Sequence, residues 1–503
     1  MSEFSARADT VPSVIGRLRP RASLNAPVVD LRLDCPAPSR WDAEHRDAFI
    51  NAIQERAADP TVRAIVLKGR RLFSDPAGVP PLLSPKDLAE VYAAVAEAGV
   101  PVIAVISGPC TGSGLDLALA CAARFAAPAA TFGDLAAGCG RLPSYHSLMR
   151  LTALVDLEQA AELCVFDATW DAEQAKAFGL IDALSPRNIP AMIDKVGEAA
   201  RLRRARSVEP EVIAAQLYGL RVRLRREAPQ RDAPLIRLRA LECAMQMPPR
   251  RAVVELEQLQ ATYGQSLEAK ALVYAARGEV LLRRRSPGLE VASELLWPLM
   301  REAIHLLDEG ATPAQLDRVF LRFGFREGPF TASDRRGLGV VFSRHGALAT
   351  SEDWCSYSPT LDLLADAGRT GGVGTPGWFR CGPDGRKGFE PEVEDLLQAS
   401  ATFQRLQRRQ LSDDLVTERC LYAAMNGAAH LLEARPDLSP EVLDAIWLRD
   451  LGFPRWRGGP LFMARTDGGH AVATLNAWAR QRITAGAPSD LLRRLAVQQT
   501  QSG

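Results

Sequence analysis

Two carboxylates, Asp116 and Asp134, lie in one stretch, 112–144, that begins Gly-Ser-Gly and continues as an apolar helical pattern. Adding water across a double bond needs two carboxylates that face one pocket, because they hold the water and move the protons. The small opening residues suit a helix whose first backbone N–H groups stabilise charge on a bound oxygen. The stretch therefore indicates a site for acid–base catalysis. Such a site would require both carboxylates to reach the same pocket.

Strand and helix patterns alternate on either side of this stretch. Alternation of this kind is typical of an α/β domain, which we place at 28–187 after an N-terminal extension, 1–27. Strands are expected at 28–33, 64–69 and 100–108, and helices at 42–58 and near 86–98.

The rest of the chain has helical patterning. Residues 188–285 predict an Arg-rich helical linker, whose basic face we interpret as solvated. Residues 286–503 contain an internal repeat in which His305 matches His430, 125 positions later, at the same apolar helical position. The repeat predicts two tandem all-α domains, 286–400 and 401–503. Since both histidines recur at that position, we expect them to pack rather than to catalyse.

Composition limits the partners and the compartment. The 503 residues have a net charge of +1 and 47% hydrophobic residues, which implies neither a nucleic-acid nor an anionic-membrane partner. The nine cysteines contain no C-x-x-C pair, which favours free thiols in a reducing compartment. We find no signal-peptide pattern, no membrane span and, at the C-terminal Gln-Ser-Gly, no peroxisomal address. A cytoplasmic location and no metal site are expected.

The sequence Gly-Val-Gly-Thr-Pro-Gly at 372–377 fits the dinucleotide pattern G-x-G-x-x-G. That pattern binds a pyrophosphate only between a strand and a helix N-terminus. Neither flank has the required character, and Pro376 lacks one backbone N–H. We expect a turn here and no NAD site.

The N-terminal part resembles the crotonase (enoyl-CoA hydratase/isomerase) superfamily. The matching segments are VPVIAVISGPCTGSGLDLALACAARFAAPAATFG (100–133), FGDLAAGCGRLPSYHSLMRL (132–151) and WDAEQAKAFGLIDAL (170–184). The resemblance implies the ββα spiral of that superfamily and a coenzyme A thioester as ligand.

The C-terminal part resembles the helical domains of 3-hydroxyacyl-CoA dehydrogenase, through MREAIHLLDEGATPAQLDRVFLRFGFREGPF (300–330), RTGGVGTPGWFR (369–380) and GFPRWRGGPLF (452–462). Residues 188–285 resemble the linker of the multifunctional fatty-acid oxidation proteins. Those proteins place an NAD-binding Rossmann domain after the linker, and here it is missing. Ser293 stands where the dehydrogenase family has an Asn. The resemblance therefore implies that dehydrogenase activity is lost, and it suggests a homodimer or a thiolase-like subunit as partner.

The family's oxyanion hole maps onto the backbone N–H groups of Ala77 and Ser113. The first loop departs from the family pattern, because Pro76 replaces a Gly and Gly78 an Asp. Proline removes only its own N–H, so the Ala77 donor is retained in principle. Ser113 also replaces a Gly, which a donor tolerates if its φ is negative.

The family's two catalytic glutamates map onto Asp116 and Ala136. Asp116 keeps a carboxylate with one methylene fewer, and alanine cannot transfer a proton. Asp134 shares a strand face with position 136 and is a candidate substitute, but a solvated loop aspartate is the favoured interpretation. The stretch thus supplies one family acid and lacks the other.

Three further residues near this region could do chemistry. His146 replaces part of a Gly-rich segment and is a candidate acid–base group. Cys110 and Cys139 would be nucleophiles only if their pKa values were lowered. Simple packing is the favoured interpretation for each of the three.

Three functions remain open. The favoured one is a degenerate multifunctional β-oxidation-like protein that binds acyl-CoA, with hydratase activity impaired and dehydrogenase activity lost. The second is an active crotonase-type hydratase, isomerase, hydrolase or decarboxylase that uses Asp116, with Asp134 and His146 as further candidates. The third is an interaction protein whose pocket is filled.

Overall fold

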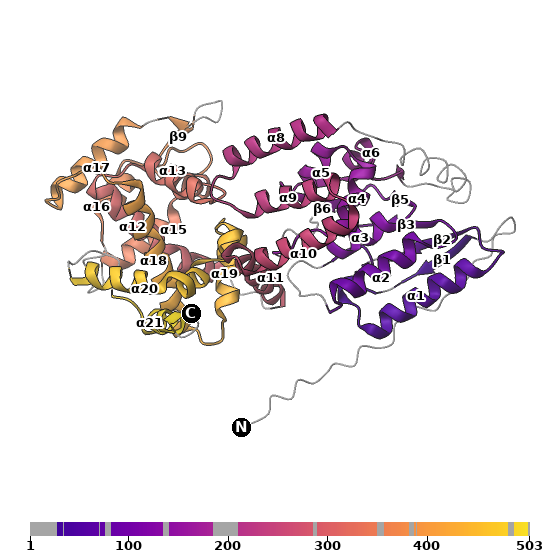
Figure 1. Ribbon diagram of the computed structural model, residues 1–503. Coiled ribbons are helices and arrows are strands. Elements are labelled where there is room, and N and C mark those ends of the chain that lie inside the picture. The colour runs from indigo at the N-terminus through magenta and orange to yellow at the C-terminus, as the bar shows by residue number, and fades with distance from the viewer. Residues whose placement is uncertain are drawn as a thin grey trace, which may run out of the picture. The chain divides into compact units, whose positions relative to one another are not determined.

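The computed structural model describes residues 28–33, 35–69, 71–75, 82–133, 140–184, 210–284, 289–349, 357–381, 387–388, 390–480 and 487–500 (Figure 1). The chain divides into two compact units, Met1–Val273 and Tyr274–Gly503.

A five-stranded parallel sheet forms the centre of the first unit, in the order β1–β2–β3–β5–β8. The side chains from Ala64 to Leu67 have no exposed surface, so this strand reads as a continuous apolar run. The expected α/β architecture is confirmed. The strands are β1 (Val28–Arg32), β2 (Ala64–Lys68), β3 (Val102–Ile106), β5 (Ala123–Ala126) and β8 (Ala183–Leu184).

A second, smaller sheet joins β4 (Pro109–Thr111), β6 (Thr131–Gly133) and β7 (Thr169–Asp171). Helix α3 (Gly112–Ala120) begins directly after β4, so the sheet fixes where that helix starts. The other elements around the two sheets are η1 (Pro38–Arg40), α1 (Ala43–Ala58), α2 (Pro85–Ala96), α4 (Tyr145–Leu154), α5 (Leu157–Cys164) and α6 (Ala172–Ala177).

The described residues from 210 to 284 form helices and no strand. Two ion pairs join helices of this region to the segment that contains α5: Arg223 contacts Glu162 of α5, and Arg237 pairs with Asp167 at 2.6 Å. Some arginine side chains of this region therefore form ion pairs that stabilise the packing, instead of facing solvent. The helices are α8 (Pro210–Glu227), α9 (Ala233–Gln246), α10 (Pro249–Gln265) and α11 (Leu267–Arg284), whose C-terminal half belongs to the second unit.

The described residues of the second unit form helices and one two-stranded ladder, β9 (Arg380–Cys381) with β10 (Lys387–Gly388). Its long helices α12 and α18 pack against each other. The helices are α12 (Leu289–Glu309), α13 (Pro313–Phe323), α14 (Pro329–Arg336), α15 (Gly339–Ala349), α16 (Pro359–Asp366), α17 (Pro391–Phe403), α18 (Asp413–Ala434), α19 (Pro440–Arg449), η5 (Arg455–Arg457), α20 (Pro460–Arg480) and α21 (Asp490–Thr500).

The sequence repeat corresponds to a structural repeat. The order α12–α13–α14 recurs as α18–α19–α20, and both copies use the same buried carboxylate. Asp317 accepts the first backbone N–H groups of α14, and Asp444 accepts those of α20. The tandem helical architecture expected from the sequence is confirmed.

The two repeat histidines do not share an environment. His305 is 7% exposed and packs as expected, beside the ion pair of Glu302 with Arg419 at 2.5 Å. The expectation for His430 is wrong, because its side chain is 57% exposed and contacts Glu433 at 3.5 Å. Residues 372–377 form the expected turn, and the fully exposed Val373 lies within it.

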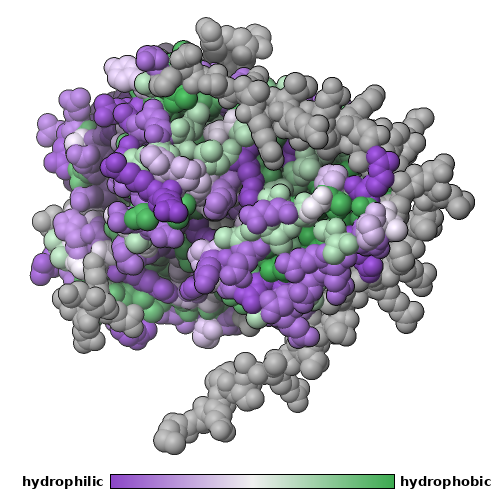
Figure 2. Space-filling model, turned by 45° about the vertical axis from the view of Figure 1, so that its right-hand side comes forward, coloured by the Kyte–Doolittle hydropathy of each residue, from purple (hydrophilic) through white to green (hydrophobic). Residues whose placement is uncertain are grey.

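Among the described residues, none of the helices is both long and apolar enough to cross a bilayer. The face drawn in Figure 2 agrees with this, because hydrophilic and apolar side chains are interspersed over it.

Candidate active site

The N-terminus of α3 is the centre of the site, and close backbone packing explains its small residues. The segment before α2 runs beside β4, where Thr111 donates its N–H to the carbonyl of Phe73 at 2.9 Å. A Cβ at Gly114 would lie 2.1 Å from the Phe73 carbonyl oxygen, and Gly112 has a φ of +52°. Only glycine fits such an approach, so the Gly-Ser-Gly sequence follows from the fold.

Asp75 occupies the donors at this helix N-terminus. The Ser113 backbone N–H donates to Asp75 Oδ2 at 3.1 Å, and the Ser113 hydroxyl donates to the same oxygen at 2.7 Å. The Ser39 hydroxyl donates to Asp75 Oδ1 at 2.8 Å. A helix N-terminus favours an anion at this place. The Ser113 N–H predicted to hold a ligand oxygen therefore holds a carboxylate of the chain itself.

Asp75 is not among the site residues predicted from the sequence. The signal available was an acid directly before Pro76, in the loop expected to carry the first oxyanion donor. The partner of that loop, Ser113, lies 38 positions away, so spacing alone could not connect the two.

Four residues of the predicted site lie outside the described residues. They are Ala77, which carries the other predicted oxyanion donor, the candidate acid Asp134, the lost catalytic position Ala136 and Cys139.

Asp116 lies on α3 one turn after Ser113. Its Oδ1 atom is buried and has no hydrogen-bond partner among the described residues. Burial raises the pKa of this carboxyl to about 6, against hydrogen bonding from Ser147 and the positive charges of Arg141 and Arg150. Asp75 adds a like charge that raises the pKa further. A carboxyl of this pKa can accept or donate a proton near neutral pH.

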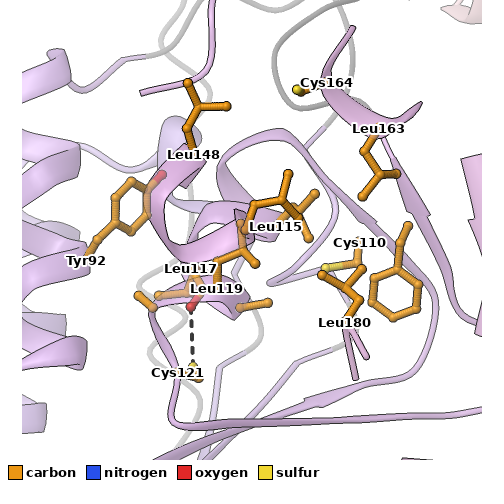
Figure 3. Packing of buried hydrophobic residues seen from close by; sticks show 14 of the residues in the cluster. Tyr92, Cys110, Leu115, Leu117, Leu119, Cys121, Leu148, Leu163, Cys164 and Leu180 are labelled. Atoms are coloured by element: carbon orange, nitrogen blue, oxygen red, sulfur yellow. Dashed lines mark hydrogen bonds between the residues drawn. The ribbon is translucent and has the colours of Figure 1, made fainter. Parts of the chain in front are cut away.

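Tyr92 of α2 supports the same helix turn (Figure 3). Its buried hydroxyl donates to the Ser113 carbonyl at 3.3 Å. Burial and the charges of Asp116 and Asp75 raise the pKa of Tyr92 well above 10, so the phenol keeps its proton. Tyr92 therefore fixes the position of the first turn of α3.

The structure brings Ser147, rather than His146, to Asp116. Helix α4 begins after its N-cap, Ser144, and this places Ser147 on the buried face and His146 on the exposed one. Burial of part of the ring and the charge of Arg150 lower the pKa of His146. No described hydrogen bond joins His146 to Asp116, so the two do not form an acid–base pair here.

The buried cysteines of this region are not activated (Figure 3). Cys110 has no exposed surface, and burial raises the pKa of its thiol well above 9. The thiol of Cys121 donates to the Leu117 carbonyl at 3.3 Å, and its pKa is raised to about 12. A nucleophilic cysteine needs the opposite shift. The part of the chain that the structure describes also contains no cluster of His, Cys, Asp and Glu suited to a metal.

Two parts of the chain match models of known families. Residues 24–202 match enoyl-CoA hydratase/isomerase, and residues 291–380 match the C-terminal domain of 3-hydroxyacyl-CoA dehydrogenase. This chain carries both domains. The hydratase/isomerase domain contains Ser113, Asp116 and Asp75. Ser293, where the dehydrogenase family carries an Asn, lies in the other domain and accepts a hydrogen bond from Arg344 at 3.1 Å.

Similar proteins include the peroxisomal bifunctional enzyme of Homo sapiens, 35% identical over 225 residues, and that of Danio rerio, 34% identical over 196 residues. The matches cover 41% and 36% of this chain, and the chain spans only 31% and 27% of those relatives. A crystal structure of an enoyl-CoA hydratase from Mycobacterium avium subsp. paratuberculosis K-10 is 18% identical, with a TM-score of 0.32, and covers 52% of this chain and 94% of that one.

Proposed function

We propose that the hydratase/isomerase domain of this chain binds acyl-CoA with impaired hydratase activity, and that the chain lacks NAD-dependent dehydrogenase activity. The contact between Ser113 and Asp75 carries the first part. Hydration builds negative charge on the thioester oxygen, which backbone donors must stabilise. Here one such donor is bonded to a carboxylate, whose own charge repels that oxygen. Losing one oxyanion donor costs roughly 100- to 1,000-fold in kcat.

The acid–base residues support the same proposal. Asp116 provides one carboxyl on α3, and the second family position is Ala136. For the dehydrogenase part, the described residues between the two matched segments form helices α8 to α11. A dinucleotide-binding domain needs a strand that leads into its phosphate loop.

The experiment compares the wild-type chain with Asp75→Ala in two assays. Calorimetry with crotonyl-CoA, butyryl-CoA and free CoA measures binding, and absorbance of the enoyl thioester measures hydration. We expect wild type to bind acyl-CoA with hydration at least about 100-fold below an active hydratase, the loss that follows from one missing donor. Asp75→Ala frees the Ser113 N–H and should tighten acyl-CoA binding about tenfold, or about 1.4 kcal/mol.

Asp171→Ala is the matched control. Asp171 caps α6 by accepting the Gln174 N–H at 2.8 Å, so its loss removes a helix cap far from α3 in sequence. It should leave acyl-CoA affinity unchanged. Efficient hydration of crotonyl-CoA by the wild-type chain would overturn the proposal.

A second function is favoured by one specific observation, the raised pKa of Asp116. A buried carboxyl with a pKa of about 6 suits a general acid or base in double-bond migration, thioester hydrolysis or decarboxylation. Under this alternative, turnover of an acyl-CoA would disappear in Asp116→Asn and would depend on pH near 6. Turnover that survives in Asp116→Asn would contradict it.

The third function, an interaction protein, predicts no affinity for acyl-CoA or CoA. A second copy of the chain or a thiolase-like subunit would then be the partner of interest. The cytoplasmic location stays a prediction, and the similar bifunctional enzymes are named as peroxisomal proteins.

A further inference from the structure

A cavity of about 350 Å³ lies at the carboxyl end of α3, at the other end of that helix from Ser113. It forms where the end of α2 and the start of β3 meet α3 and α4. Aliphatic side chains make up most of its wall, and the volume is within the usual range of small-molecule sites. Its wall includes Val95, Val100, Cys121, Arg124, Arg150 and Leu154.

Arg150 is the unpaired cation of this wall. Its guanidinium makes no hydrogen bond or ion pair with any described residue, and its Nη1 atom is buried. Asp116 and Glu97 are close enough to act on its charge, yet neither pairs with it. A guanidinium stays charged in proteins, and a buried polar group without a partner is rare in native structures. The buried Nη1 atom of Arg150 therefore has a hydrogen bond to offer to a ligand.

The other polar side chains of the wall, Arg124 and Cys121, already have partners. Arg124 donates to the carbonyls of Leu180 at 2.8 Å and Cys121 at 2.7 Å, and it pairs with Asp182 at 3.3 Å. The Cys121 thiol is engaged with the carbonyl of Leu117, as the dashed line in Figure 3 marks. One cation without a partner thus remains beside an apolar surface.

We propose that this cavity binds a small carboxylate with an apolar body, such as a short-chain monocarboxylic acid. The carboxylate pairs with Arg150, since a guanidinium and a carboxylate match in geometry and charge. The hydrocarbon part lies against Val95, Val100 and Leu154. Inorganic phosphate is a poorer fit, because the apolar wall would strip its water and offer few hydrogen bonds in return.

Calorimetry on the full chain tests the ligand class with three probes: hexanoate, 1-hexanol and inorganic phosphate. We expect hexanoate to bind at least tenfold more tightly than either of the other two. Arg150→Met should weaken hexanoate at least tenfold, and Arg150→Lys should weaken it less because the charge remains. Equal affinity for hexanoate and 1-hexanol, or tighter binding of phosphate, would overturn the proposal, and so would no binding of hexanoate.

A second pair of variants does not depend on removing Arg150. Ala153 is exposed on α4 and lies three positions after Arg150, a spacing at which helical side chains meet. Ala153→Glu places a carboxylate beside the guanidinium and should abolish hexanoate binding, whereas the uncharged Ala153→Gln should retain it. Equal binding by these two variants would contradict a site at Arg150.

Asp75→Ala separates this site from the acyl-CoA site. Asp75 lies at the other end of α3, so its loss should leave hexanoate affinity within about twofold. If Asp75→Ala changes hexanoate affinity as it changes acyl-CoA affinity, hexanoate occupies the acyl-CoA site and the inference fails. This outcome is independent of whether the chain hydrates crotonyl-CoA.

Discussion

Helices α3 and α20 begin in the same way, each with a carboxylate from another element on its first N–H groups. Asp444 accepts the N–H groups of Leu461 and Phe462 at 3.0 and 2.8 Å, and Asp75 accepts that of Ser113 at 3.1 Å. The two carboxylates differ in their surroundings. Asp444 has no exposed surface and lies within a helix, whereas Asp75 is half-buried in the loop predicted to hold a ligand.

The difference shows how one electrostatic device serves two purposes. At α20 the carboxylate is part of the fold, since no ligand could replace a fully buried group. At α3 it takes a donor that a thioester oxygen would otherwise use. Removing Asp444 should therefore lower the free energy of unfolding more than removing Asp75. That difference would distinguish a carboxylate that caps a helix for stability from one that occupies a binding site.

The largest effect is expected for Asp444→Ala. The change leaves the buried N–H of Leu461 and the partly buried N–H of Phe462 without an acceptor, at about 1–3 kcal/mol each, and so should cost about 4 kcal/mol. At about 2–4 °C per kcal/mol, the thermal transition of the helical unit should fall by about 8–16 °C, measured by scanning calorimetry of the full chain. Asp437→Ala is the control, because that side chain is 61% exposed, and it should change the transition little. Equal shifts for the two variants would contradict the assignment.

Asp116 should make the stability of the first unit depend on pH. Its pKa is about 6 in the folded protein and near 3.8 in an unfolded chain, so between those values the folded state binds the extra proton. The stability gained is fully present below about pH 4 and is lost as pH rises through 6, up to about 3 kcal/mol. Asp116→Asn cannot titrate, so its stability relative to wild type should rise with pH.

Urea unfolding of both proteins at pH 4.5, 5.5, 6.5 and 7.5 measures this difference. Comparing variant with wild type at each pH cancels other titrating groups, including Asp444, whose pKa burial raises to about 7. A constant difference across the pH range would show that Asp116 has an ordinary pKa in the folded chain.

A smaller effect is expected for Asp75→Asn, which keeps the shape of the side chain and removes its charge. Helix caps contribute about 1 kcal/mol, so the first unit should lose about that much. Scanning calorimetry measures it beside Asp444→Asn, whose loss should be larger because Asp444 is fully buried. If the Asp75 variant loses as much as the Asp444 variant, Asp75 is as much a part of the fold as Asp444.

The fold was predictable from sequence because its signals are local or repeated. The strands at 28–33 and 64–69 are short segments rich in Val, Leu and Ile, and each expected end lies within one residue of the observed one. The helical repeat was visible because 286–503 contains two copies of one pattern. His430 shows the limit of that reasoning, since the repeat preserves a position on a helix but not what packs against it.

The sequence predicted only those site residues that lie together on a single helix. Ser113 and Asp116 lie on α3, so their order and spacing locate them. Asp75 reaches Ser113 through a loop path set by its pairing with β4, and no periodicity encodes such a path. The sequence indicated His146 as a candidate and not Ser147. Which of the two side chains is buried depends on the residue at which α4 begins.

The smallest effect is expected for His146→Ala, which tests that choice directly. The imidazole is exposed and is bonded to no described acid, so the variant should stay within about 0.5 kcal/mol of wild type in urea unfolding. The pH dependence assigned to Asp116 should also be unchanged, because Ser147, Arg141 and Arg150 surround that carboxyl and His146 does not. Ser147→Ala is the matched comparison one position along, and it should move the Asp116 midpoint upward, because hydrogen bonding from Ser147 lowers that pKa. If His146→Ala moves the midpoint instead, the histidine and Asp116 act together, and an acid–base pair at α3 returns as the better interpretation of this site.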